Sequence, residues 1–248
     1  MQRKISVSFP VKHGLKDGPK DKCYCPVLII TKLRIKCLPG ARTLFFCADI
    51  LQYIWRKGNR MHEIEPFYNW RHLYTAETDQ RSPFFGREYS EFVFSHTVYN
   101  YYVHPQWDEF GSRTMYMKIL YADYETGYAI IELIGEWNDA IENDIQTLRR
   151  EVTDILFYEG IRYFILITEN VLNFHSSDDS YYEDWFQELD EEGGWVVILN
   201  MPEQSQYDFK KAKLNRYITL MDLPDWRTVQ PQHLFQIIHD HQQKRLNE

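Results

Sequence analysis

Several common patterns are absent from this 248-residue sequence, and each absence excludes a class of protein. No run of 18 or more apolar residues occurs, so a membrane-spanning helix is not expected. The first residues lack an apolar stretch followed by a small-residue cleavage site, so we expect a cytoplasmic protein. The motifs G-x-G-x-x-G, Walker A, G-x-S-x-G and H-E-x-x-H are also missing, so no cofactor and no common hydrolase chemistry is indicated.

Glutamate is missing from residues 1–60, which hold 13 Lys and Arg against three Asp. Their charge balance is +10, whereas residues 61–248 have a balance of −18. All four cysteines also lie in the first segment: Cys23, Cys25, Cys37 and Cys47. A change of composition this sharp predicts a boundary at Met61.

Three interpretations of residues 1–60 are open. A basic nucleic-acid-binding arm explains the charge, but "VLIITKLRIKCL" is too apolar for a solvated arm. A zinc site would use the cysteines, whose spacing lacks the paired C-x2-C units of common zinc modules. We favour the third interpretation, in which translation starts at Met61 and residues 1–60 lie upstream of the true start. The acidic remainder gives no indication of a nucleic-acid partner.

Residues 61–113 are rich in aromatic side chains and show no sustained period, and we expect this part to pack against the rest of the chain. A short helix is predicted near Pro66–Glu77 and a strand over Thr97–His104. Residues 114–124 alternate between two faces, and residues 128–137 form a third extended run. Short turns separate these runs, so the sequence predicts an antiparallel meander of three strands.

After Trp137 the apolar period becomes that of a helix, which Asn138 and Asp139 are suited to cap and Gly160 to end. Its predicted apolar stripe is Ile141, Ile145, Leu148, Val152, Ile155 and Leu156. A second helix, which ends at Gly193-Gly194, is predicted to bury Tyr182, Trp185, Phe186 and Leu189. The other predicted elements are buried strands at 162–168 and 195–200, an edge strand at 217–223, and helices at 204–217 and 231–245. Residues 114–248 are therefore expected to be an α/β domain, a mixed sheet with antiparallel entry strands followed by βα units.

This order of elements resembles the STAS domain, the fold of the SpoIIAA-like anti-sigma factor antagonists. In that family a strand ending in glycine precedes the first long helix, as in "IELIGEWNDA" here. A later strand leads to a loop whose serine is phosphorylated in the regulatory members. Phe174-His175-Ser176-Ser177-Asp178 occupies that place, with His175 where the family has Asp and Asp178 where it has Gly. The resemblance implies that Ser176 is the phosphorylated residue and that the protein switches between partners.

A second resemblance covers more of the chain. The segments "SPFFGREYSEF", "YNYYVHPQWDEFGS" and "FILITENVLNFH" are similar to a bacterial protein family of Bacteroidetes type. The similarity begins at "MHEIEPFYNWRHLYTAE", which agrees with a start at Met61. It implies no activity.

The stretch "NFHSSDDSYYEDWF" (173–186) leaves three interpretations open. In the first, its Ser and Asp residues only cap the helix that follows. In the second, phosphorylation of Ser176 or Ser177 adds about −1.5 to −2 charge and so displaces an acidic partner or favours a basic one. In the third, a divalent metal or an acid–base pair uses His175, Asp178, Asp179 and Glu183, although H-x2-D-D-x3-E matches no common metal signature.

From these observations we predict a non-enzymatic protein-interaction module controlled by phosphorylation of Ser176 or Ser177. One alternative is a small metal-dependent enzyme that uses the loop around His175. The other is a structural, oligomeric protein without a switch. The expected partner is another protein, with a homodimer as an open alternative, and no nucleic acid or membrane.

Overall fold

The computed structural model describes residues 64–90, 94, 96–98 and 101–246. The chain divides into two units, residues 1–60 and 61–248, and every described residue belongs to the second. The three interpretations of residues 1–60 therefore fall outside the described residues and stay predictions, as does the division at residues 113 and 114.

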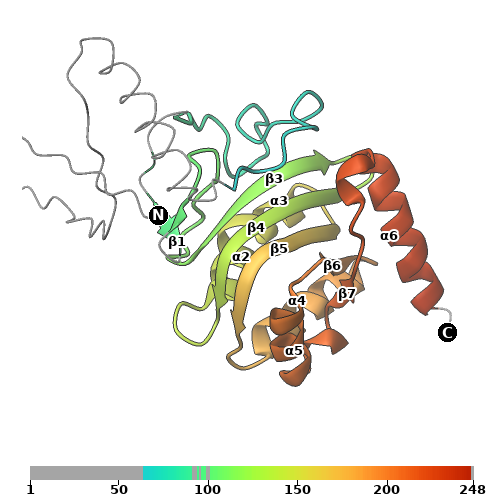
Figure 1. Ribbon diagram of the computed structural model, residues 1–248. Helices are drawn as coiled ribbons and strands as arrows, with labels where there is room; N and C mark the ends of the chain where they lie inside the picture. Colours follow the sequence, from blue (N-terminus) through green and yellow to red (C-terminus); the bar gives the residue numbers. More distant parts are fainter. Residues whose placement is uncertain (1–63, 91–93, 95, 99–100, 247–248) are drawn as a thin grey trace, which may run out of the picture. The chain divides into compact units, whose positions relative to one another are not determined.

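A five-stranded mixed sheet in the order β3-β4-β5-β6-β7 forms the centre of the second unit (Figure 1). Strand β3 (Met115–Asp123) is antiparallel to β4 (Tyr128–Asn138). The following strands, β5 (Tyr163–His175), β6 (Trp195–Leu199) and β7 (Thr219–Met221), all pair in parallel. The predicted α/β architecture, an antiparallel entry followed by βα units, is confirmed.

Helices cover both faces of this sheet and create two cores. On one face, buried side chains from α4 (Ser180–Glu191) and α5 (Glu203–Lys211) pack against β4 and β5. On the other face, α6 (Pro231–Leu246) packs against Tyr128 and the centre of β5. Because β5 is covered on both sides, its residues 164–167 are all fully buried, which explains the continuous apolar run in the sequence.

The first helix beyond the β-hairpin differs from its prediction. It starts at Asp144, not at Asn138, as α2 (Asp144–Leu148), a π-helical turn η1 (Arg149–Thr153) and α3 (Asp154–Tyr158). The apolar residues Ile145, Leu148, Val152 and Leu156 are buried as predicted, but Ile141 is 79% exposed and Ile155 37%. Ile141 precedes the helix, and the wider π turn shifts the phase of the residues after it.

The helix α4 buries Tyr182, Trp185 and Leu189 as predicted, while Phe186 is 39% exposed. The helix predicted for 204–217 is shorter, because α5 ends at Lys211 and a 3-10 turn, η2 (Leu214–Arg216), follows. A further 3-10 turn, η3 (Trp226–Thr228), leads into α6. Among the described residues no helix is both long and apolar enough to cross a membrane.

The helix predicted near Pro66–Glu77 is wrong, because these residues form successive turns. The N–H of Leu73, for example, donates to the carbonyl of Trp70 at 2.8 Å. Trp70 is buried in the core beneath α6, and the N–H of Phe67 donates to the buried carboxylate of Glu132 at 2.9 Å. These contacts with the sheet take the place of helical hydrogen bonds, so tertiary packing overrides local preference here.

The predicted three-stranded meander is also wrong. In place of one strand at 97–104, two short strands, β1 (Thr97–Val98) and β2 (Tyr101–Tyr102), pair with each other in a separate sheet. Among the described residues of this region, one isolated bridge reaches β3 and joins Asp108 to Met117. Val103 and Trp107 pack on Tyr116 and Ile134 in a small core of their own, so the chain crosses the face of β3 and does not extend the sheet.

Candidate functional site

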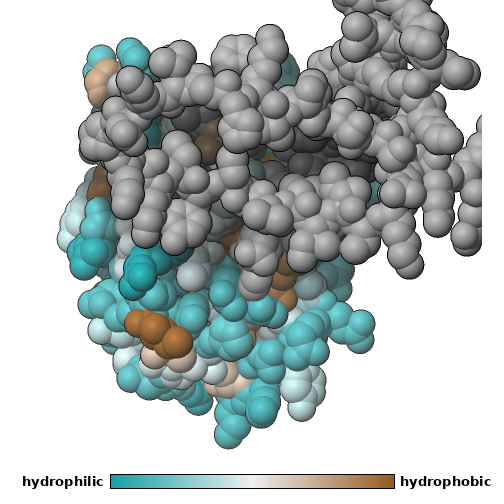
Figure 2. Space-filling model, turned by 60° about the vertical axis from the view of Figure 1, so that its left-hand side comes forward, coloured by the Kyte–Doolittle hydropathy of each residue, from teal (hydrophilic) through white to brown (hydrophobic). Residues whose placement is uncertain are grey.

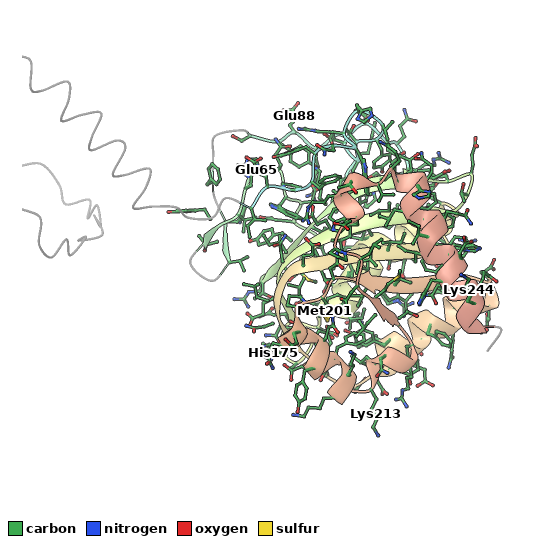
Figure 3. The ribbon with its side chains drawn as sticks, turned by 45° about the vertical axis from the view of Figure 1, so that its right-hand side comes forward. Glu65, Glu88, His175, Met201, Lys213 and Lys244 are labelled. Atoms are coloured by element: carbon green, nitrogen blue, oxygen red, sulfur yellow. The ribbon has the colours of Figure 1, made fainter. Side chains whose placement is uncertain are left out.

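Two loops meet at the carboxyl ends of β4 and β5: the β4–α2 loop (139–143) and the β5–α4 loop (176–179). The last residues of the two strands, Asn138 and His175, are partners in the ladder. Beyond them, the N–H groups of Asp139 and Ala140 donate to the carbonyl of His175 at 2.9 and 3.3 Å. Figure 3 shows His175 at the end of the unit far from Glu88. In α/β folds this edge of the sheet is the usual place for a binding site.

A buried carboxylate, Asp139, holds the two loops together. One oxygen accepts the indole N–H of Trp137 at 3.0 Å and the N–H of Ile145 at 2.8 Å, and the other accepts the hydroxyl of Tyr182 at 2.5 Å. Burial raises the pKa of Asp139 to about 6, although these hydrogen bonds favour its ionised form. Asp139 was expected to cap the helix, and it does bind the first turn of α2, but Asn143 occupies the N-cap position.

The residues of the metal interpretation each have a different partner. His175 Nε2 lies 3.3 Å from a carboxylate oxygen of Glu136, and Asp179 forms an ion pair with Arg216. Asp178 accepts the N–H of Ser180 at 2.9 Å and also its hydroxyl, while Glu183 accepts the side-chain amide of Gln187 at 3.4 Å. Within the described part of the chain, no group of three or more His, Cys, Asp or Glu is placed to hold a metal ion. The metal alternative stays a prediction without support from the geometry.

The two serines of the regulatory interpretation differ from their neighbours. Within the part of the chain that the structure describes, no hydrogen bond or ion pair involves the side chain of Ser176 or Ser177. Ser177 is exposed and Ser176 half-buried. At the start of α4 the carboxylate of Asp178 accepts the N–H of Ser180, and Asp179 occupies the N-cap position, so these serines are not the caps of that helix.

The surface around the loops combines apolar and acidic side chains. Ile141 is 79% exposed and Leu172, on β5, is 50% exposed. Asp178 lies on the same loop, Glu183 lies on the first turn of α4, and Asp184 follows it. Figure 2 shows a largely hydrophilic surface, interrupted by a small hydrophobic area, on the side that carries these loops. Exposed apolar side chains within a polar rim are typical of protein–protein interfaces.

Two ionic clusters that include buried side chains lie away from the loops, and neither was predicted from the sequence. In one, the ammonium group of Lys118 lies 3.2 Å from Asp108 and 3.8 Å from Glu77, above the ring of Tyr89. Burial lowers the pKa of Lys118 and raises that of Asp108. Because successive residues of a strand point to opposite faces, the sequence places Lys118 on the face of β3 opposite to that of Met117. The partners of Lys118 come from residues 77, 89 and 108, and no local sequence pattern connects these residues with it.

The second cluster joins β4 and β5 to the turn η3. The Arg227 guanidinium lies 2.5 Å from Glu169 and 3.8 Å from the buried Glu132. Glu169 also accepts the indole N–H of Trp226 at 2.7 Å and the side-chain amide of Asn200 at 2.8 Å. These bonds fasten the chain between β7 and α6 to the sheet.

No protein-family model and no curated protein matches the chain. Similar solved structures include the anti-sigma factor antagonist SpoIIAA in its unphosphorylated form, with 17% identity over 45% of this chain and 91% of that chain (TM-score 0.37). The Bacillus cell fate determinant SpoIIAA in the phosphorylated form has 17% identity over 45% of this chain and 95% of that chain (TM-score 0.34).

These similarities concern the fold of less than half of the chain and carry no information on activity. The order of strands and helices from β3 to α6 is itself the one predicted, and the similarity of part of the chain to the SpoIIAA structures is one of fold alone. The resemblance to the Bacteroidetes-type family stays a prediction.

Proposed function

We propose that residues 61–248 form a non-enzymatic protein-interaction module whose binding of a partner is controlled by phosphorylation of Ser176 or Ser177. The observation that carries this proposal is the state of the two hydroxyl groups, which have no partner among the described residues. Every other polar side chain of this loop has one. A kinase can therefore modify either serine without breaking a contact of the fold.

A phosphate in this loop would change the local charge considerably. It adds about −1.5 to −2 next to Asp178 and Asp179. The guanidinium of Arg216 is already paired with Asp179, so the added charge lacks a ready internal partner. Phosphorylation therefore alters the potential of the surface that a partner meets, while the sheet beneath it stays unchanged.

The connections of the loop support an effect beyond the serine itself. The carbonyl of His175 accepts two N–H groups from the β4–α2 loop, and Tyr182 on α4 binds Asp139 at the base of the same loop. A displacement of the β5–α4 loop is thereby transmitted to the loop that carries the exposed Ile141. Apolar side chains of this kind are candidate anchors of an interface.

The test is a phosphopeptide analysis of the protein isolated from its own cells under several growth conditions. We expect phosphate on the peptide 173–186 at Ser176 or Ser177. Ser180 is the matched control, because its hydroxyl is already bonded to Asp178, and we expect no phosphate there. Complete absence of phosphate from both serines in all conditions would contradict the proposed control.

A pair of variants then tests the consequence for binding. Ser176→Asp is expected to change which proteins are cross-linked to the full chain in its own cells, whereas Ser176→Ala keeps the unphosphorylated pattern. Both variants should change the free energy of unfolding by less than about 0.5 kcal/mol, because surface substitutions without a structural role have effects of this size. Identical cross-linked partners for both variants would leave the loop without a regulatory role.

A further inference from the structure

Strand β3 forms one edge of the five-stranded sheet, and β7 forms the other. Strand β7 is the last strand in the sheet order, and within the described part of the chain its one partner strand is β6. Figure 1 shows it between α6 and α5. The carbonyl of Met221 accepts the N–H of Asn200, the residue after β6, at 3.0 Å. Met221 therefore directs its backbone polar groups toward β6.

Successive residues of a strand direct their backbone polar groups to opposite sides. Since Met221 faces β6, the N–H and C=O of Leu220 face away from the sheet. Among the described residues, neither group has a backbone hydrogen-bond partner beyond the strand pairing. An extended peptide that adds to a sheet edge forms main-chain hydrogen bonds with such a residue, which offers both an N–H donor and a C=O acceptor.

Two hollows adjoin this edge, and both are lined by Asn215 and Thr219. The first, of about 370 Å³, is lined by Leu220 itself together with Lys210 and His241. The second, of about 270 Å³, contains the aromatic side chains of Phe186, Trp195 and Tyr217. A solvated edge strand needs no such space beside it, whereas an added strand needs room for side chains on either side of its backbone.

The charges in the first hollow indicate what such a strand would carry. The ammonium group of Lys210 donates to the side-chain oxygen of Gln206 at 3.2 Å and forms no ion pair with any described carboxylate. Asp222, in the same hollow, is bonded to the amide nitrogen of Gln206 at 3.1 Å. Lys210 thus keeps donors for an incoming acid. In the second hollow the exposed ring of Phe186 lies 6.0 Å from that of Tyr217, which suits an apolar side chain.

We propose that the edge of β7 binds an extended peptide segment of a partner protein by strand addition. The backbone of the segment pairs with Leu220, an acidic side chain meets Lys210, and an apolar side chain enters the hollow with Phe186. This site adjoins the β5–α4 loop, because Asp179 of that loop pairs with Arg216, which lines the second hollow. Binding of the segment does not require phosphorylation.

The test uses a phage-displayed library of random linear dodecamers, selected on the full chain, and the best selected peptide made synthetically. We expect the selected peptides to combine an acidic residue with β-branched or aromatic residues. Bound peptide should slow hydrogen exchange of the Leu220 amide. A selection without binders, or binders that leave this amide unprotected, would overturn the proposal.

Matched variants separate the backbone contact from the side chain. Leu220→Pro removes an N–H that faces away from β6 together with the leucine side chain, which packs against the core, and an edge strand tolerates proline there. Leu220→Ala shortens the side chain and keeps the N–H. We expect Leu220→Pro to weaken the peptide by about tenfold or more, as the loss of a hydrogen bond implies, and Leu220→Ala to weaken it much less. Equal affinities for the two variants would overturn strand addition.

If Leu220→Pro does not fold, two further measurements test strand addition. Lys210→Glu should weaken acidic peptides several-fold and leave the unfolding temperature unchanged, and an unaltered affinity counts against the site. Sedimentation tests whether a second copy of the chain, and not a peptide of another protein, occupies the edge of β7. If the wild type is a dimer and Leu220→Pro a monomer, a second copy of the chain pairs with β7 and the peptide proposal is wrong.

Discussion

At the scale of single residues, the buried acids are the most unusual feature. Glu132 is 1% exposed, and burial raises its pKa to about 7. The N–H of Phe67 and the charge of Arg227, 3.8 Å away, favour the ionised form without overcoming the cost of burial. The folded protein therefore holds a proton on Glu132 at pH values where the unfolded chain has lost it.

This difference predicts a dependence of stability on pH. Because the pKa of Glu132 in the folded protein lies above the ordinary value of 4.5, the contribution of Glu132 is most favourable below pH 4.5 and is lost as the pH rises to about 7. Glu132→Gln removes the titration and keeps an acceptor for Phe67. We expect this variant to gain stability relative to the wild type between pH 4.5 and 8, by about 3 kcal/mol as the upper limit of this shift.

Urea unfolding of both proteins at pH 4.5 and pH 8 measures the gain. Glu125→Gln removes a charge from an exposed turn and serves as the control, for which the difference from the wild type should be small at both pH values. A Glu132→Gln effect of the same size at both pH values would show that the buried group does not titrate in this range.

The candidate site was predictable from single residues only in part. A loop after a buried strand and before an amphipathic helix could be located from the sequence, and His175 to Asp179 do lie there. The sequence could not show that Asp178 binds Ser180 while Ser176 and Ser177 stay unbonded, because local alternatives for hydrogen bonding are nearly equal. The role of Asp139 depends on Tyr182, 43 residues away, and no local pattern relates the two.

At the scale of the elements, the end of β4 depends on one glycine. Gly135 has φ +120°, and a Cβ atom there would lie 2.2 Å from the carbonyl oxygen of Thr114. That same oxygen accepts the N–H of Glu136 at 3.0 Å, so the close approach is part of the β3–β4 hairpin. The glycine of "IELIGEWNDA" lies inside β4, which continues to Asn138, and it is required by the packing of two backbones.

Gly135→Ala is therefore expected to cost about 3 kcal/mol or more in the free energy of unfolding, since it combines backbone strain with a clash. Gly86→Ala is the matched control. Gly86 also has a positive φ, +74°, but nothing lies within 4 Å of a Cβ atom there, so its loss should be about 1–2 kcal/mol. Thermal and urea unfolding of the two variants measure the difference. Equal losses in the free energy of unfolding would mean that the backbone at Thr114 moves enough to accommodate the added methyl group.

The elements also show where the periodicity of the sequence predicts structure and where it fails. Strand β3 and helix α4 were predicted in place, the first from its alternation and the second from its stripe at Tyr182, Trp185 and Leu189. The alternation of β3 is broken by a β-bulge between Ile119 and Tyr121, which places Leu120 and Tyr121 in the same core. The π turn at Arg149–Thr153 was not predicted, because its extra residue has no signature in a pattern of apolar positions. The aromatic residues of 97–104 favour strands, but their packing on the face of β3 decides that they form only a small hairpin.

At the scale of the whole second unit, residues before 114 complete both cores of the sheet. Trp70 is buried with α6 on one face, and Phe84 and Phe110 are buried on the other. The same segment supplies the N–H that binds Glu132 and the carboxylate of Asp108 that binds Lys118. Its removal would expose apolar surface and leave a buried acid and a buried lysine without their partners.

We therefore expect residues 61–248 to unfold in one cooperative transition, and residues 114–248 alone to aggregate or to lack such a transition. A lysine deprived of its buried carboxylate costs about 3–5 kcal/mol, comparable to the stability of a small domain. Circular dichroism melts and sedimentation of the two fragments test this. If residues 114–248 melt cooperatively at the same temperature, the α/β part is an independent domain and the aromatic segment is an accessory. If only the longer fragment folds, the aromatic segment belongs to the folding unit, and tests of the β5–α4 loop and of the β7 edge require it.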